Sequence, residues 1–428
     1  MSTQSTVELP HWETTPPDPE AAIREIKAAI RARIEASGRT VEEVFAVVEA
    51  RVGEKVEEIE AAKARGEWVW PVIDYADIEA GTVPAETVEL VHRRGCAVIR
   101  GHFEREQALA WDKDIVDYVE RNAFFENYRG PGDDFFGSVG SRPEIYPIYW
   151  SRAQMEARQS DRMARVQSFL NHRWTYASDG TQWFDPDRDS LYPDRIRRRP
   201  PGASSGGLGS HVDVGTLDLW MTSAYQRAFR QLFDGTVEQY DPWDASYRTS
   251  GPQYPSTTMC SVFRTFQGWT ALSDMAHDQG VLFTVPIPEA MAYMMLRPLL
   301  PDVAEDDMCG VSVGQVFPVN ERWHPLLVRA FAGIPDVRAG DSVWWHADVI
   351  HGVAPVESQE GWGNVMYIPA APWCPRNADY APRVYEAFRN GDSPSDFPEE
   401  HYERSWPDRF QPDELNETGR RGFGAQNA

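Results

Sequence analysis

Basic residues are in the minority in this 428-residue chain, and long apolar runs are absent. Lys and Arg number 42 against 66 Asp and Glu, which gives a formal net charge of −24. Binding to nucleic acid or to an anionic membrane surface depends on clustered basic side chains, so we expect neither partner. No stretch approaches the run of about 18 apolar residues that a membrane-spanning helix needs, so we expect no membrane segment.

Cysteine is scarce as well. The spacing of the four cysteines suits neither a zinc cluster nor a disulfide framework. The first twenty residues lack a basic region followed by an apolar region, so we expect no signal peptide and a cytoplasmic protein. The cysteines are Cys96, Cys260, Cys309 and Cys374.

The N-terminal part, residues 1–66, is predicted to be a helical extension. Pro19 after Asp18 begins one helix, and Thr40 with Glu43 has the spacing of a capping box that begins a second. Both helices are amphipathic, which favours a role in packing or in forming a homo-oligomer. The apolar stripe of the first helix consists of Ile23, Ile26, Ile30 and Ile34.

Residues 67–390 are predicted to form the main domain, mainly β with helices (α+β). After a strand at VWPVIDYADI, a helix at ETVELVHRRG and a strand at CAVIRGHF, the C-terminal half contains short strands separated by turn residues, which is typical of an antiparallel barrel or sandwich. We expect the tail, 391–428, to dock on this body through Tyr402, Trp406 and Phe410. The later strands are predicted at TMCSVFRTF, GWTALSDM, GVLFTVP, DSVWWHA, VIHGVAPV and GNVMYIPAA.

A metal site is predicted at His211 and Asp213, which follow a Gly-rich loop. In an extended chain, residues two apart point to the same side, so both side chains can bind one ion. GDSVWWHADVIHGVAP supplies His351 as a third ligand, with His346 as its competitor. Two histidines and one carboxylate leave positions open, as in non-heme Fe(II) oxygenases, although Zn, Mn, Co or Ni would also fit these ligands.

The order of these motifs resembles that of a known enzyme group. Residues 269–286 and 340–352 are similar to segments of the phytanoyl-CoA dioxygenase-like branch of the Fe(II)/2-oxoglutarate oxygenases, and nearly all of the chain resembles the YbiU-like proteins, most recognisably at GWGNVMYIPAAPWCPRN. The resemblance implies a double-stranded β-helix (a jelly-roll or cupin-like barrel) with helical insertions. It also implies a dioxygenase using Fe(II), 2-oxoglutarate and O2, and an iron held by the ligands His211, Asp213 and His351.

The residue that would anchor 2-oxoglutarate departs from the family pattern. Relatives usually hold the remote carboxylate with an Arg on the last barrel strand, whereas this chain has Trp362 and Asn364 there and no Arg. Arg264, on the predicted third barrel strand beside the last one, is the replacement we predict, since Arg binds a carboxylate through two hydrogen bonds. The co-substrate contacts predicted are therefore Arg264, Asn364 and Trp362, with Arg376 and Arg383 as lesser candidates.

A basic cluster precedes the Gly-rich loop and has two interpretations. It either binds an anionic group of the substrate or is a solvated loop paired with neighbouring aspartates. On the first interpretation, the substrate is a small polar metabolite such as a nucleotide, nucleoside, sugar phosphate or amino acid, which the enzyme hydroxylates, desaturates or cyclises. The cluster is Arg195, Arg197, Arg198 and Arg199, and the aspartates are Asp185, Asp187, Asp189 and Asp194.

Two other functions fit the same residues. A cupin-like isomerase or hydrolase would use the metal without 2-oxoglutarate, which would explain the missing Arg. A barrel that binds a metabolite without catalysis would keep the cavity but would not need a working metal site. The complete ligand set argues against the non-catalytic barrel, whereas the isomerase or hydrolase would keep the same three ligands and would turn over its substrate without air.

Overall fold

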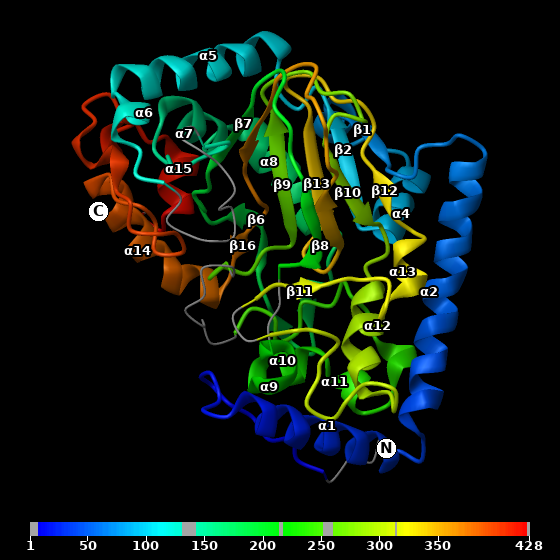
Figure 1. The fold of residues 1–428 in the computed structure, drawn as a ribbon. Helices are drawn as coiled ribbons and strands as arrows, with labels where there is room; N and C mark the ends of the chain where they lie inside the picture. Colours follow the sequence, from blue (N-terminus) through cyan, green and yellow to red (C-terminus); the bar gives the residue numbers. More distant parts are fainter. Residues whose placement is uncertain (1–6, 131–142, 214–216, 251–259, 313–314, 426–428) are drawn as a thin grey trace.

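The computed structural model describes residues 7–130, 143–213, 217–250, 260–312 and 315–425. Within these ranges, two large sheets face each other (Figure 1). The larger sheet has the order β1 (Val72–Asp74), β2 (Cys96–Arg100), β13 (Ser342–His346), β9 (Phe266–Ala271), β15 (Gly363–Tyr367), β7 (Ile196–Arg199) and β3 (Ile145–Tyr146). The smaller sheet has the order β11 (Phe317–Pro318), β8 (Leu208–Val212), β14 (Ile350–Val353), β10 (Leu282–Val285) and β12 (Ala332–Gly333).

Neighbouring strands of both large sheets are antiparallel, except for the parallel pair β1 and β2. This confirms the predicted antiparallel architecture, and the molecule is a mixed α/β structure. Two small two-stranded sheets accompany the large ones: β16 (Pro372–Trp373) with β6 (Asp185–Asp189), which are distant in sequence, and the hairpin of β4 (Ala177–Ser178) with β5 (Thr181–Gln182).

Helices surround the sheets, and none of those in the described ranges is long and apolar enough to cross a membrane. The helices between β1 and β8 in the chain are α3 (Tyr75–Ala80), α4 (Ala85–Arg94), α5 (Arg105–Arg121), α6 (Phe124–Asn127), α7 (Arg152–Arg158) and α8 (Asp161–Asn171). Those that follow β8 are α9 (Asp218–Met221), α10 (Ser223–Ala228), α11 (Arg230–Phe233), α12 (Ala290–Leu296), α13 (Pro325–Val328), α14 (Pro375–Asn390) and α15 (Glu417–Gly422).

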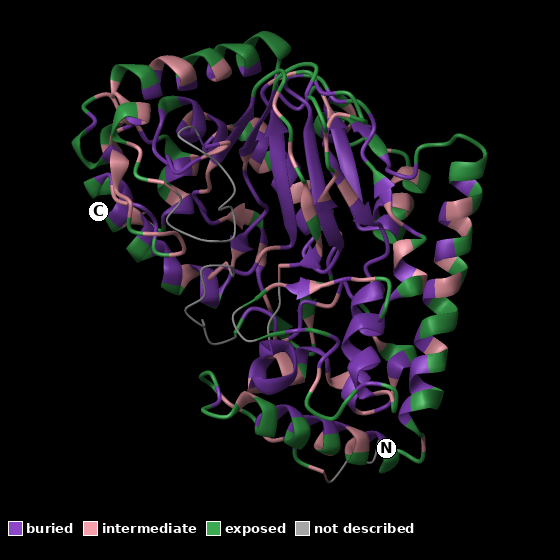
Figure 2. Cartoon of the chain, in the orientation of Figure 1, coloured by how far each residue is buried: buried purple, intermediate pink, exposed green. Residues whose placement is uncertain are grey.

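The two predicted N-terminal helices are confirmed as α1 (Pro19–Glu35) and α2 (Val41–Ala64). Asp18 caps α1, and Thr40 and Glu43 form the predicted capping box of α2. Their apolar faces belong to the same buried cluster as the inner faces of both sheets. Figure 2 shows this buried interior and the exposed outer faces of the helices. The extension is therefore packed into the main core.

The C-terminal segment contacts the rest of the chain through buried side chains. Trp406 and Phe410 are buried, and the Glu403 carboxylate accepts hydrogen bonds from the Tyr118 hydroxyl at 2.7 Å and from the backbone N–H of Trp150 at 2.9 Å.

Two predicted strands are wrong in part. VWPVIDYADI forms a strand only over β1 and then turns into α3, whose buried Tyr75 and Ile78 have helical spacing and which ends at Gly81 with φ +69°. TMCSVFRTF, residues 258–266, is irregular over 260–265 and is a strand only at Phe266, where β9 begins. At Phe263 the Asn377 side chain bonds both the backbone N–H and the C=O, which removes these groups from any strand ladder. Residues 258–259 lie outside the described residues.

The basic cluster is not a loop. Residues 196–199 form β7, a buried strand between β15 and β3. Because strand side chains alternate, Arg195, Arg197 and Arg199 point to the opposite face from Ile196 and Arg198.

Candidate metal centre and ligand cavity

His211 and His351 lie opposite each other on the adjacent strands β8 and β14. The Nδ1 of His211 is 2.7 Å from the Gly209 carbonyl oxygen, and that of His351 is 3.1 Å from the Val349 carbonyl oxygen. When Nδ1–H donates to a carbonyl, the lone pair of the imidazole is on Nε2. Both histidines are therefore held in the tautomer that binds a metal through Nε2.

Asp213 completes the predicted set. Its Oδ1 lies 3.2 Å from Nε2 of His211 and 3.5 Å from Nε2 of His351, and one ligand atom from each residue lies within 4.8 Å of the others. Asp213 follows directly after β8, so its side chain returns to the side of His211. The structure thus brings together the three residues that the sequence pattern singled out, in a cluster that could hold one ion.

The charges suit a cation. Burial opposes ionisation of Asp213, but His351 and His211 beside it hold the pKa of its carboxyl well below its ordinary value. Burial is the largest influence on both histidines and lowers the pKa of His351. At His211 the hydrogen bond and the charge of Asp213, together with the Gly209 carbonyl, outweigh burial and raise the pKa. A carboxylate is therefore present at neutral pH to balance a bound cation.

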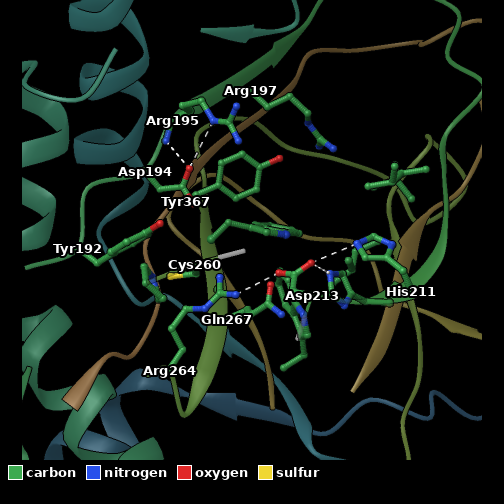
Figure 3. Close-up of a pocket in the computed structure, with 18 of the residues that line it drawn as sticks. Tyr192, Asp194, Arg195, Arg197, His211, Asp213, Cys260, Arg264, Gln267 and Tyr367 are labelled. Atoms are coloured by element: carbon green, nitrogen blue, oxygen red, sulfur yellow. Dashed lines mark hydrogen bonds and ion pairs between the residues drawn. The ribbon is translucent and has the colours of Figure 1, made fainter. Parts of the chain in front are cut away.

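Arg264 holds the other oxygen of the same carboxylate. Its Nη2 donates to Asp213 Oδ2 at 3.2 Å, which leaves Oδ1 directed toward the two histidines. Figure 3 shows Arg264 and His211 on opposite sides of Asp213. Arg264 precedes β9, which is paired with β15 as predicted.

A cavity of about 170 Å³ opens beside the cluster, which is room for a small metabolite rather than for a single water. Strands of both sheets line it, and so does the C-terminal segment through Asp396 and Phe397. Apolar side chains that include Leu208, Leu282 and Val353 form the wall on the smaller sheet.

Besides Arg195, whose charge pairs with Asp194, three side chains of the cavity lining have a buried donor without a hydrogen-bond acceptor among the described residues. The donors are Nε of Arg197 on β7, Nε2 of Gln267 on β9 and Nε1 of Trp345 on β13. Gln267 and Trp345 are opposite each other in the sheet, and the Trp345 and His351 rings are 5.2 Å apart. Because a buried donor without an acceptor costs free energy, this wall is suited to a ligand rich in oxygen acceptors.

Several other predicted residues lie away from the cluster. His346 stacks on Trp174 at 4.4 Å and accepts from the backbone N–H of Asp348, which removes it as the competitor of His351. Trp362 is exposed and packs under Arg198, and buried Asn364 donates to Asp112. Neither Trp362 nor Asn364 is among the residues that line the described cavity.

The lesser arginine candidates also have other contacts. Arg376 donates from Nε to the Ser261 carbonyl at 2.7 Å and borders a smaller neighbouring cavity, and Arg383 lies over the Tyr380 ring. Neither is among the residues that line the cavity beside the metal cluster.

Two donors were missed in the sequence, although one left a signal. Gln267 is the only side chain with an amide or charge in the buried strand FQGWTA, where an apolar residue would be expected on a core face. Trp345 gives no such signal, because tryptophan is ordinary in a buried strand.

Comparison with known proteins shows close relatives. YbiU of Escherichia coli K12 is 59% identical over 415 residues, which are 96% of this chain and 98% of YbiU. A Salmonella typhimurium LT2 protein of known structure, provisionally named an oxidoreductase, is 56% identical, with coverage of 97% of this chain and 99% of that one and a TM-score of 0.92.

A fungal protein shares the fold at lower identity. The GlcNAc Inducible Gene 2 protein of Candida albicans is 24% identical, covers 96% of this chain and 90% of its own, and superposes with a TM-score of 0.76. The Gig2-like family model matches residues 18–425. This chain therefore belongs to the Gig2-like family.

Proposed function

We propose that this protein is a non-heme Fe(II)/2-oxoglutarate-dependent dioxygenase that oxidises a small metabolite. The observation that carries the proposal is the cluster of His211, Asp213 and His351, in which Nε2 of both histidines faces one carboxylate oxygen beside a cavity. Two histidines and one carboxylate on one side of an ion leave coordination positions for a co-substrate and O2.

The strand order supports a double-stranded β-helix as the scaffold. Successive strands β7, β8, β9 and β10 alternate between the larger and the smaller sheet, and β13, β14 and β15 do so again. Such alternation between two facing antiparallel sheets is the construction of a jelly roll.

The residues fit iron and a 2-oxo acid. Nε2 of both histidines and Oδ1 of Asp213 would hold the metal, while Arg264 keeps the second oxygen of Asp213 occupied. The unpaired donors Gln267 and Trp345, next to His351, suit the carboxylate of a 2-oxo acid bound at the metal. The apolar wall excludes water from the site.

Bound iron with its co-substrate would supply the oxidising chemistry: a substrate C–H group, O2 and 2-oxoglutarate give an alcohol, succinate and CO2. Hydroxylation is the simplest outcome, with desaturation and cyclisation as variants. The substrate we propose is a small polar metabolite.

The test is anaerobic addition of Fe(II) and then 2-oxoglutarate to metal-free protein, followed by visible spectroscopy. We expect the weak charge-transfer band of the iron–2-oxo acid chelate, and its loss in His211→Ala and Asp213→Ala. His277→Ala is the matched control, because His277 is exposed and paired with Asp336 away from the cavity. Metal binding without a band would contradict the proposal and favour a metal-dependent isomerase or hydrolase.

A further inference from the structure

Arg197 differs from the other arginines of its strand. Arg195 forms an ion pair with Asp194, Arg198 with Asp112 at 3.0 Å and Arg199 with Glu144 at 3.0 Å. Arg197 has no ion pair or side-chain hydrogen bond with any residue that the structure describes, although it is only 8% exposed.

An unpaired buried guanidinium is costly, and it stays protonated in proteins. Burial lowers the pKa of Arg197, as expected where no carboxylate of the described residues touches the cation. The side chain lines the cavity and enters it from the side away from Arg264 in the view of Figure 3. Its free charge is therefore turned toward the space where a ligand binds.

Arg197 lies beside β15, the strand that lacks the arginine expected there in relatives. Arg197 on β7 is the direct neighbour of Val365 on β15, the strand on which relatives were expected to carry the anchoring Arg. Val365 in turn pairs with Ala271 on the neighbouring strand β9. Ala271 lies four residues beyond Gln267, which is roughly 13 Å along that strand. Hydrogen-bond donors therefore line the cavity from Trp345 and Gln267, near the metal cluster, to the guanidinium of Arg197.

Arg264 is less suited to hold a remote group. Its Nη2 donates to Oδ2 of Asp213, which is itself one of the proposed metal ligands. Arg264 therefore already has a carboxylate partner, whereas Arg197 has none among the described residues.

We infer that Arg197 binds the remote carboxylate of the 2-oxo acid and so selects a dicarboxylic co-substrate, while Arg264 is a positioning residue for Asp213. This inference rests on the proposed function and moves the anchor from the sequence-predicted Arg264 to a different strand. Tyr367, which lines the cavity on β15, lies near Arg197 and provides a neutral neighbour rather than a counter-charge.

The experiment compares two five-carbon acids, 2-oxoglutarate and 2-oxovalerate, which lacks the remote carboxylate. Each is titrated anaerobically into the Fe(II) protein, and the chelate band gives its dissociation constant. We expect Arg197→Gln to weaken 2-oxoglutarate by about 100-fold, as for loss of a buried hydrogen-bonded charge pair, and to leave 2-oxovalerate unchanged. Arg197→Lys, which keeps the charge and safeguards folding, should retain part of the preference.

Arg198→Gln is the matched control, because it removes the next guanidinium of the same strand from the opposite face. It should keep the wild-type preference for 2-oxoglutarate. The inference is overturned if both Arg197 variants keep that preference, or if Arg264→Gln alone abolishes it. Failure of the proposed function looks different, because wild-type protein would then form no band with either acid.

Discussion

At the scale of single residues, neighbouring arginines have opposite roles because a strand alternates its faces. Arg198 is as buried as Arg197, but it pairs with Asp112 and lies over Trp362, whereas Arg197 one position earlier lines the cavity. The sequence IRRR indicates a basic cluster. Which arginines share a face can be predicted only once the segment is known to be a strand, because side chains of a strand alternate between its two faces.

Arg264 should matter more for the metal than for the co-substrate. We expect Arg264→Gln to weaken Mn(II) binding by about 10-fold, because residues that orient a metal ligand contribute to affinity on this scale. Isothermal titration of Mn(II) into metal-free protein measures the effect, and Arg264→Lys should recover part of it. Unchanged Mn(II) affinity together with a raised Michaelis constant for 2-oxoglutarate would instead support the anchoring role predicted from the sequence.

At the scale of elements, the strands β9 and β13 of the large sheet approach closely where Gly268 faces Trp344. A Cβ added at Gly268 on β9 would lie 2.5 Å from Cε3 of Trp344 on β13. We expect Gly268→Ala to lower the free energy of unfolding by about 1–3 kcal/mol, the usual cost of overpacking, as measured by urea denaturation.

Gly53→Ala in α2 is the control for that substitution. A Cβ there meets no atom within 4 Å, so removing a helical glycine should raise stability by up to about 1 kcal/mol. Equal effects at the two positions would show that the contact with Trp344 does not limit the sheet.

Local signals explain which elements were predictable. Thr40 and Glu43 are three apart and bond each other's backbone, so the start of α2 can be recognised without tertiary information. His211 and His351 could be chosen from motif order, but their approach depends on the pairing of β8 with β14. The irregular backbone at Phe263 depends on Asn377, 114 residues away, which no local pattern reveals.

At the scale of the whole molecule, Glu403 ties the tail to the body and makes stability depend on pH. Burial raises its pKa from 4.5 to about 7, so between these values the folded protein binds more protons than the unfolded chain. The free energy of unfolding then falls as pH rises, by up to about 1.4 kcal/mol per pH unit from this group.

Glu403→Gln removes that titration. We therefore expect the stability advantage of the wild type over the variant to shrink between pH 5 and pH 8 in urea denaturation. The exposed Glu399→Gln is the control and should run parallel to the wild type. Parallel curves for Glu403→Gln as well would contradict the assignment.

The cavity wall formed by Asp396 and Phe397 has a consequence for biosynthesis. His211, Asp213 and His351 all leave the ribosome before this segment does, so a nascent or prematurely terminated chain can gather its metal ligands while one side of the cavity is still open to solvent. Redox-active metal in such a half-built site would be exposed to O2 without a substrate in place. If the cluster binds iron as proposed, synthesis of residues 396–397 would complete the wall of a site whose ligands had already been made.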